Sequence, residues 1–305
     1  MQISVIICTH NPRTDYLART LDALKAQTLP KEQWELLLID NASKEPLAGK
    51  WDLSWHPHAR HFREEKLGLT FARLRGITEA KADLLVFVDD DNILASDYLE
   101  SCNAISKDWP ILGAWSGNVI PEFEVSPPNE MTPYLWCLCI RTVERDVWSN
   151  YADTKNCPWG AGMCVRSTVA RCYMEKGGRN PLHTFLGRRG SELGSAEDLE
   201  LATTSYELGL GTGLFHTLKI THLIPQRRLT IDYFINLIAD SEATRVVFSH
   251  LHGQQLFQST SRIDRLVALY KQFRASPLQR RIQKAFENGR HKGRAIIDTN
   301  DAKSP

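Results

Sequence analysis

The sequence has little of what marks several common protein classes. Its seven cysteines are an odd number and none forms a Cys-x-x-Cys pair, which argues against a zinc site and favours free thiols in a reducing cytoplasm. No apolar stretch is long enough to span a bilayer, and no signal-peptide pattern precedes the first predicted strand. The net charge of +1 gives no general reason to expect a nucleic-acid partner.

Two phosphate-binding signatures are also missing. No Gly-x-Gly-x-x-Gly follows the first predicted strand and no Gly-x4-Gly-Lys-Ser/Thr occurs, so neither a dinucleotide-binding fold nor a P-loop is supported. The 305 residues, 42% hydrophobic and 24% charged, are instead typical of a soluble globular chain with one large domain or two small ones.

The first half alternates predicted strands with predicted helices. The β-branched and apolar runs predict buried strands over residues 3–9, 34–40 and 84–91, with a weaker one over 59–63. Between them, helical patterns cover 16–27, 68–81 and 96–107, the first capped by Thr14. This order predicts an α/β fold with a doubly wound, mostly parallel sheet flanked by helices.

An acidic cluster ends the strand over 84–91. Asp89, Asp90 and Asp91 stand in a row before Asn92, and neighbouring carboxylates repel one another, so folding alone does not explain the cluster. A divalent cation removes that repulsion, and hard cations prefer oxygen ligands. Ligands of open α/β sheets bind beyond the carboxyl ends of the strands, which favours metal and phosphate chemistry here over a solvated acidic turn.

Other polar side chains follow the neighbouring strands. Thr9 ends the first strand, and Asp40 ends the second, where it can accept a hydrogen bond from a base imide or a ribose hydroxyl, or cap the turn that follows. Arg73 and Arg75 lie on the helix that precedes the acidic strand, and they either reach a phosphate or lie on a solvated face.

Four segments in this order, VIICTHN, LLLIDNAS, GLTFARLRG and LLVFVDDDN, resemble the nucleotide-sugar half of family 2 glycosyltransferases with the GT-A fold. The resemblance implies that Asp91 ligates Mn²⁺ or Mg²⁺ on the donor diphosphate and that Asp89 faces the ribose or the metal, with Asp90 at the variable position. It also implies nucleotide-sugar contacts from Thr9, Asn11, Asp40 and Arg73. Leu74 stands where the family commonly has Asn, and Arg75 is an additional candidate.

Two later segments are similar to acceptor-side motifs of the same family. Trp159 and Gly160 open a Gly-Ala-Gly-Met segment that borders the sugar in the family, although Trp159 also suits simple packing. Glu197 and Asp198 match the family's Glu-Asp pair, which implies that Asp198 is the general base and that Glu197 orients a sugar. The alternative is helix capping, with Ser195 as the cap and the acids in the first turn.

A late segment completes the predicted site. By resemblance, His222 is a further metal ligand, the alternative being a structural histidine, and Arg227 or Arg228, with Arg228 preferred, contacts the diphosphate. The Gln-x-x-Arg-Trp motif of processive synthases is absent from this segment, which favours addition of a single sugar.

The segment over residues 262–294 has another character. Apolar residues recur at helical spacing among many basic ones, which is typical of peripheral contact with an anionic membrane surface or of a partner helix. The alternative is a helix that packs on the catalytic domain with a solvated basic face.

Together these patterns predict a catalytic domain over residues 1–240, divided into a nucleotide-sugar half (1–120) and an acceptor half (121–240), and a basic helical extension over 241–305. The predicted activity is metal-dependent, inverting transfer of one sugar, with a UDP-sugar favoured, to a saccharide or lipid-linked saccharide acceptor. The predicted location is the cytoplasm or the inner face of the membrane, in polysaccharide or glycolipid assembly. The alternatives are a sugar nucleotidyltransferase and a silent docking subunit.

Overall fold

The computed structural model describes residues 1–151, 156–253 and 274–301. They form one nine-stranded sheet of order β3-β2-β1-β4-β8-β6-β9-β5, with β7 paired to β9. The strands are β1 (Ile3–Thr9), β2 (Trp34–Asn41), β3 (Ala59–Glu64), β4 (Leu84–Asp89), β5 (Asn92–Leu94), β6 (Leu112–Phe123), β7 (Val147–Ser149), β8 (Cys164–Arg166) and β9 (Gly211–Ile224). The helices are α1 (Thr14–Lys25), α2 (Leu69–Glu79), α3 (Tyr98–Asp108), α4 (Ser167–Arg179), α5 (Glu197–Glu207), α6 (Ile231–Leu251) and α8 (Pro277–Asp301), with the 3-10 helices η1 (Lys31–Gln33), η2 (Asn129–Leu138), η4 (Pro181–Phe185) and η5 (Gln226–Arg228).

The predicted parallel half is confirmed. Strands β1 to β4 run parallel, and the register pairs Thr9 with Asp40 and Cys8 with Asp89. The polar ends of three strands therefore meet at one edge of the sheet. One detail was wrong: α1 begins at Thr14 itself, after Arg13, and has no side-chain cap.

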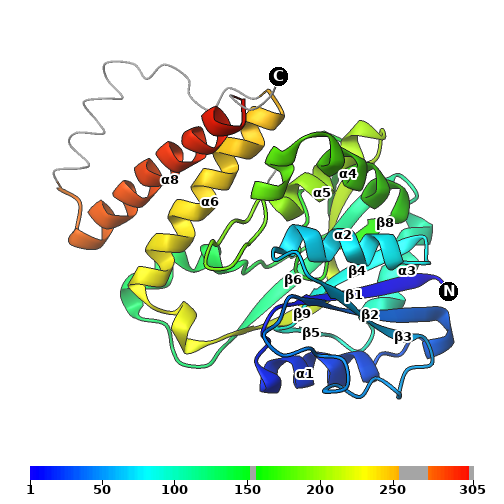
Figure 1. Ribbon diagram of the computed structural model, residues 1–305. Helices are drawn as coiled ribbons and strands as arrows, with labels where there is room; N and C mark the ends of the chain where they lie inside the picture. The colour runs from blue at the N-terminus through cyan, green and yellow to red at the C-terminus, as the bar shows by residue number, and fades with distance from the viewer. Residues whose placement is uncertain (152–155, 254–273, 302–305) are drawn as a thin grey trace.

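Alternate residues of the strands enter two separate cores. In β1, Ile3, Val5 and Ile7 pack with α1 and α3 on one face, whereas Ile6 packs with α2, α4 and α5 on the other. Figure 1 shows α2, α4 and α5 above the sheet and α1 below it. This two-sided burial is why these strands are apolar without interruption.

The second half adds antiparallel and long strands. Strand β8 runs antiparallel to β4 and β6, and β6 pairs with β9 in parallel over most of its length. Gly211 and Gly213 belong to β9, where Val147–Ser149 of β7 lies against them. The short strand β5 was not predicted, and it pairs Asn92 with His222.

Helices α6 and α8 stand beside the sheet as a parallel pair, as Figure 1 shows. Gly289 and Gly293 let the helix backbones approach closely, since an added Cβ would lie 2.4 Å from the carbonyl oxygen of Ala239 and 2.7 Å from that of Ala243. The predicted domain boundary at residue 240 falls inside α6. In the part of the chain that the structure describes, no helix is both long and apolar enough to cross a membrane.

Part of the basic extension packs against the rest of the chain, as the alternative interpretation predicts. Lys292 pairs with Asp240 at 3.0 Å and Arg290 with Glu242 at 3.1 Å. The apolar and basic residues predicted over 262–273 lie outside the described residues. The seven cysteines are all free, as expected.

Candidate functional site

The three consecutive aspartates at the end of β4 have three different sets of partners. The hydroxyl of Thr9 donates a hydrogen bond to Asp90, Arg73 lies 3.7 Å from Asp89, and Asp91 faces His222 and Arg228. Burial raises the pKa of Asp90 to about 7, with repulsion from Asp91 as the second cause. Burial also opposes ionisation of Asp91, but His222 and Arg228 outweigh it and lower its pKa to about 2. The cluster thus contains one strongly ionised acid and one that titrates near neutrality.

Strand pairing explains why His222 reaches Asp91. Because Asn92 pairs with His222 across β5 and β9, the preceding residue lies beside the imidazole, and Nε2 of His222 is 3.5 Å from Oδ2 of Asp91. Nη1 of Arg228 is 3.2 Å from the same oxygen and 3.0 Å from Nε2 of His222. Three predicted residues therefore converge on one point.

The pair of Asp91 and His222 fits a shared divalent cation. Two ligand atoms about 2.1 Å from one ion lie roughly 3 to 3.5 Å apart, close to the separation of these two atoms. Nδ1 of His222 is buried and without a hydrogen-bond partner among the described residues. Residues 1–151, 156–253 and 274–301 contain no third His, Cys, Asp or Glu that completes a metal-binding group. Such a cation would need its remaining ligands from a diphosphate and water, as is usual for Mg²⁺.

A buried ion pair connects the two acidic segments. Arg73, buried in α2, forms an ion pair with Glu197 at the start of α5 and also lies near Asp89. The hydroxyl of Tyr173 donates to the other oxygen of Glu197 at 3.4 Å. Burial raises the pKa of Glu197 to about 7 despite the opposing effect of Arg73. Glu197 is only 2% exposed and its carboxylate faces Arg73 and Tyr173, so its predicted role in orienting a sugar stays a prediction.

Asp198 is held by backbone groups. Its Oδ2 accepts the N–H of Gly160 at 2.8 Å and its Oδ1 accepts the N–H of Leu199 at 2.8 Å. Each oxygen keeps a further lone pair for another donor. The expected cap by Ser195 was wrong, because α5 is preceded by Ala196, without a side-chain cap, and the Ser195 hydroxyl donates to Ser241 instead.

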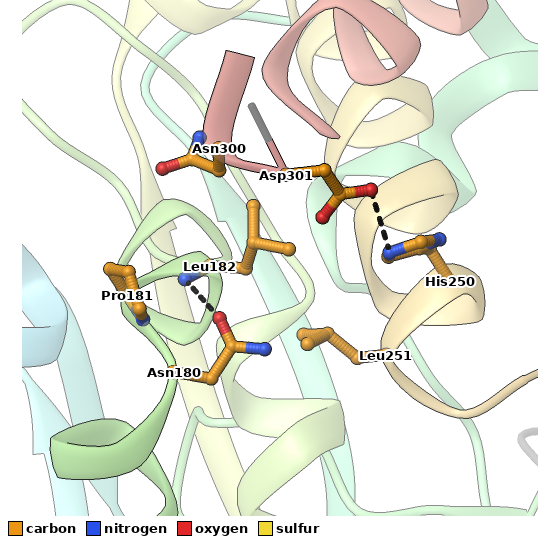
Figure 2. Close-up of a pocket in the computed structure, with 7 residues that line it drawn as sticks. All are labelled: Asn180, Pro181, Leu182, His250, Leu251, Asn300 and Asp301. Carbon is orange, nitrogen blue, oxygen red and sulfur yellow. Dashed lines mark hydrogen bonds and ion pairs between the residues drawn. The ribbon is translucent and has the colours of Figure 1, made fainter. Parts of the chain in front are cut away.

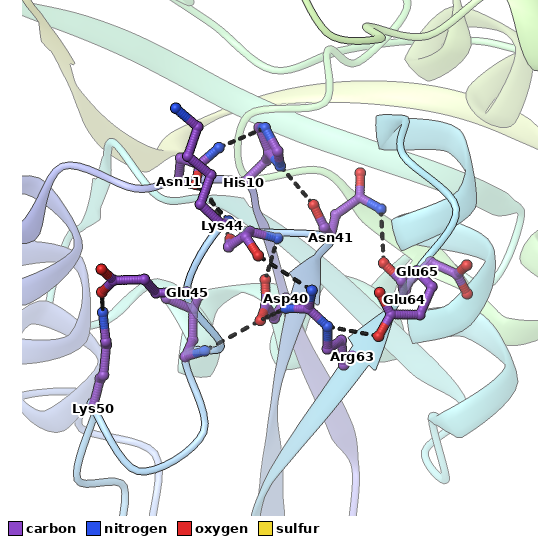
Figure 3. A network of polar contacts seen from close by, with 12 residues as sticks. His10, Asn11, Asp40, Asn41, Lys44, Glu45, Lys50, Arg63, Glu64 and Glu65 are labelled. Carbon is purple, nitrogen blue, oxygen red and sulfur yellow. Dashed lines mark hydrogen bonds and ion pairs between the residues drawn. The ribbon is translucent and has the colours of Figure 1, made fainter.

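Asp40 and Asn11 organise the turn after β2, which Figure 3 shows. The carboxylate of Asp40 accepts the N–H groups of Ser43 at 3.0 Å and Leu47 at 3.1 Å, and Arg63 lies 2.7 Å from it. Burial would raise the pKa of Asp40, but these hydrogen bonds lower it. Oδ1 of Asn11 accepts the N–H of Lys44 at 2.9 Å. These contacts match the turn-cap alternative, and base contacts by Asp40 and Asn11 stay a prediction.

Two other predicted residues have different surroundings. Arg75 pairs with Glu79 at 2.9 Å and lies over the Phe62 ring, so the structure does not bring it to the acidic cluster. The guanidinium of Arg141 lies 3.5 Å from the ring centroid of Trp159 and covers one face of the indole. Only the other face of Trp159 is left for a sugar.

The sequence interpretation missed Arg188 and Cys139. Arg188 precedes α5 in a glycine-rich loop, and the charges that act on it include Asp89 and Asp91. Its guanidinium makes no hydrogen bond or ion pair with described residues, and the residue is half-buried. Cys139 follows η2 and lies within electrostatic reach of Asp198, Arg188 and Arg228. Neither residue has a sequence signal that separates it from ordinary loop positions.

Backbone strain occurs at the same place. The non-glycine residues with positive φ among those described are Asn11 (49°), Ala42 (52°) and Cys139 (55°). Two of them follow the ends of β1 and β2 and the third lies near Asp198. Strained residues of this kind concentrate at functional sites.

A pocket of about 300 Å³ lies elsewhere, where η4 meets the C-terminal ends of α6 and α8 (Figure 2). Its lining consists of Asn180, Pro181, Leu182, His250, Leu251, Asn300 and Asp301. None of the predicted site residues is among them. The chemistry argued above therefore belongs to the strand ends and not to this pocket.

The comparisons with known proteins agree with this geometry. Residues 4–150 match the family described as glycosyl transferase family 2. The chain is 22% identical over 239 residues to the glucosyl-dolichyl phosphate glucuronosyltransferase of Haloferax volcanii, covering 77% of this chain and 73% of that protein. It is 29% identical over 101 residues to glycosyltransferase AglE of the same organism, a match that spans 33% of that protein.

Solved structures show the same fold. S. aureus TarS 1-349 has a TM-score of 0.53 at 15% identity, with 98% of this chain and 92% of that chain covered. The structure of GalNAc-T7 with UDP, GalNAc and Mn²⁺ has a TM-score of 0.53 at 18% identity, and the match covers 89% of this chain and 56% of that chain. At these identities the likeness establishes the GT-A fold and no further property.

Proposed function

The chain belongs to glycosyl transferase family 2, and on that premise we propose that it transfers one sugar from a nucleotide sugar, with a uridine nucleotide favoured, to an acceptor hydroxyl. The observation that carries the proposal is the placement of two carboxylate groups with different surroundings. Asp91 lies beside Arg228 and His222 at the end of β4, whereas Asp198 is held by backbone N–H groups at the start of α5. Arg73 links the two segments through Glu197 and Asp89.

The donor diphosphate belongs at the first group. Asp91 and His222 would hold Mn²⁺ or Mg²⁺, which neutralises charge on a leaving diphosphate when it is bound. Arg228 adds a fixed positive charge at the same point, and Arg188 offers N–H donors that no described protein group uses. Arginine donors suit phosphate oxygens because their planar geometry allows two parallel hydrogen bonds.

The acceptor belongs at Asp198. The carboxylate takes the proton of the acceptor hydroxyl as its oxygen bonds to the anomeric carbon, and the bond from that carbon to the diphosphate oxygen breaks. Attack opposite the leaving group in one step inverts the anomeric centre. The N–H of Gly160 fixes the direction of Oδ2, so the base is oriented before the acceptor arrives.

Glu197 has a different role from Asp198 in this proposal. Its carboxylate is taken up by Arg73 and Tyr173, and so it positions Arg73 against Asp89. The name of the Haloferax volcanii relative refers to a glucosyl-dolichyl phosphate, which supports a lipid-linked saccharide as acceptor and a place in glycolipid or polysaccharide assembly.

The test is calorimetric titration of UDP, GDP and dTDP with Mn²⁺ and again with EDTA. We expect one nucleotide to bind only with the metal. Asp91→Ala should abolish this binding, whereas Asp198→Asn should preserve it and remove sugar transfer. Equal loss of binding in both variants, without loss of folding, would contradict the separation of roles.

A further inference from the structure

Arg141 is placed beside the candidate site by the sheet. Its backbone forms two hydrogen bonds with Val119 of β6, at 2.9 and 3.1 Å. Its guanidinium stacks on Trp159, and its Nη1 donates to the carbonyl oxygen of Cys157 at 2.9 Å. The backbone of Arg141 is therefore fixed by the pairing with Val119, and its side chain by two further contacts.

The charge of Arg141 is not matched within the described protein. Arg63, Arg73 and Arg228 each pair with an aspartate or glutamate, but no described carboxylate lies within ion-pair distance of Arg141. Arg166, also without a carboxylate, donates to the carbonyl oxygens of Leu112, Ser106 and Trp109. Arg141 has one carbonyl partner for its five N–H donors, although the side chain is half-buried.

Burying a charge without a partner is unfavourable, and here the loss of solvation is large enough to lower the pKa of Arg141 to about 10. The guanidinium nevertheless stays protonated at neutral pH. The stacking on Trp159 offsets part of the cost. An arginine that is partly desolvated, held rigidly and left with free donors is suited to bind an anion.

The location indicates which anion. Trp159 directly precedes Gly160, whose N–H binds the proposed base Asp198. Arg141 is thus connected to Asp198 through Trp159, on which it stacks, and Gly160, and the charge of Asp198 acts on the guanidinium. A ligand there belongs to the reacting saccharides and not to the nucleotide, which lies with Asp89 to Asp91 at the end of β4.

We propose that Arg141 and Trp159 form a subsite beside Asp198 for an anionic group, a carboxylate or a phosphate ester, carried by one of the two reacting saccharides. The inference rests on the proposed function and narrows its substrate class. The anion has two possible sources, a carboxylate on the transferred sugar or an anionic group on the acceptor. Both would accept two parallel N–H groups from the guanidinium.

Binding of two matched ligand pairs distinguishes these sources. The donor pair is UDP-glucuronate and UDP-glucose with Mn²⁺, and the acceptor pair is an alkyl glucosyl phosphate and the alkyl glucoside, titrated into UDP-loaded protein. In the wild type we expect the anionic member of one pair to bind at least ~10-fold more tightly than the neutral member, the size of a charge-assisted hydrogen bond. The pair that shows the preference identifies the saccharide that carries the anion.

Variants of Arg141 test whether this residue causes the preference for the anionic ligand. Arg141→Gln should remove the preference while leaving binding of UDP itself unchanged, and Arg171→Gln, an exposed position on α4, should change neither. Should Arg141→Gln fail to fold, Arg141→Lys keeps the charge but not the planar contact, and the preference should fall several-fold at an unchanged melting temperature. A purely structural arginine would alter stability without altering the preference.

The results separate the two proposals. Equal binding of both members in both pairs, or a preference that survives Arg141→Gln, would overturn the subsite while metal-dependent UDP binding still supports the proposed function. Absence of UDP binding in the wild type would overturn the proposed function itself.

Discussion

The backbone N–H of Gly160 donates to Oδ2 of Asp198 at 2.8 Å, while an added Cβ at residue 160 would lie 2.4 Å from Nη2 of Arg73. Gly160 therefore touches both the carboxylate proposed as base and the cation that reaches the acidic cluster at the end of β4. The distance between the two acidic segments depends on the absence of a side chain at this one position.

Gly160→Ala should accordingly lower sugar transfer by about 100-fold, the order of effect expected when reacting groups are displaced by roughly 1 Å. The added methyl group must push Arg73 away from Glu197 or turn the Gly160 N–H away from Asp198. Turnover measured together with the melting temperature checks the prediction. Gly177→Ala is the matched control, because nothing lies within 4 Å of a Cβ there and the helix α4 accepts alanine readily. Equal activity of the two variants would contradict the argument.

Arg188→Gln should weaken nucleotide-sugar binding by roughly 10-fold without lowering the melting temperature, because its guanidinium makes no hydrogen bond within the described protein that could be lost. Arg73→Gln should instead destabilise the fold, since Glu197 would be left buried without its partner. Titration calorimetry and thermal unfolding of both variants make the comparison. Arg189→Gln, at an exposed neighbouring position of the same loop, serves as the control. Unchanged binding in Arg188→Gln would remove this residue from the donor site.

Glu200 should make stability depend on acid pH. It is fully buried, Nε2 of His252 lies 2.6 Å from one oxygen, and Lys176 lies 3.5 Å from the other. Burial would raise the pKa of Glu200, but these partners lower it below the ordinary value. A carboxyl whose pKa is lower in the folded state contributes stability above its unfolded pKa, and this contribution is lost as the pH falls through the folded pKa.

Glu200→Gln should therefore lower the free energy of unfolding by roughly 3 kcal/mol near neutral pH, because Lys176 and His252 lose their buried, negatively charged partner. The difference from the wild type should shrink at a pH below the ordinary Glu pKa of about 4.3, as the wild-type carboxyl is protonated too. Urea unfolding at both pH values provides the measurement, with Glu287→Gln at an exposed position of α8 for comparison. A difference that does not change with pH would contradict the assignment.

Gly289→Ala should separate α8 from α6. The new methyl group would lie 2.4 Å from the carbonyl oxygen of Ala239, and a backbone oxygen cannot move without distorting α6. We expect a loss of about 1 to 3 kcal/mol, typical of overpacking. Asn288→Ala, the exposed residue next to it, should be neutral or slightly stabilising. Protection of the α8 amides from hydrogen exchange would show the difference directly.

The donor half could be predicted because its signals are local. The runs that form β1, β2 and β4 are apolar without interruption, and strand ends define where polar groups meet. The acceptor half has fewer such signals. Strand β5 has three residues, too few for any periodicity, and so its pairing of Asn92 with His222 could not be read from the chain.

Some residues of the site could not be predicted from the sequence, for physical reasons. Arg188 and Arg141 resemble any loop arginine in sequence, and only the tertiary structure shows that both have unused donors near carboxylates or aromatic rings. Conversely, the sequence predicted the same role for Arg75 as for Arg73, although the two residues lie two positions apart on helix α2. That spacing turns Arg75 toward Glu79 and Phe62 and Arg73 toward the buried side.

The contacts of the site join residues far apart in the chain: Arg73 and Glu197 are separated by 124 positions, and Asp91 and Arg228 by 137. Contacts of such separation form slowly, since long loops must close before they contribute stability. During synthesis, Arg73 leaves the ribosome before the acidic cluster, whereas His222 and Arg228, which face Asp91, follow it by more than a hundred residues. Until β9 and η5 have been made, the nascent donor half therefore lacks the groups that face Asp91, and a divalent cation bound there would stabilise the folding intermediate.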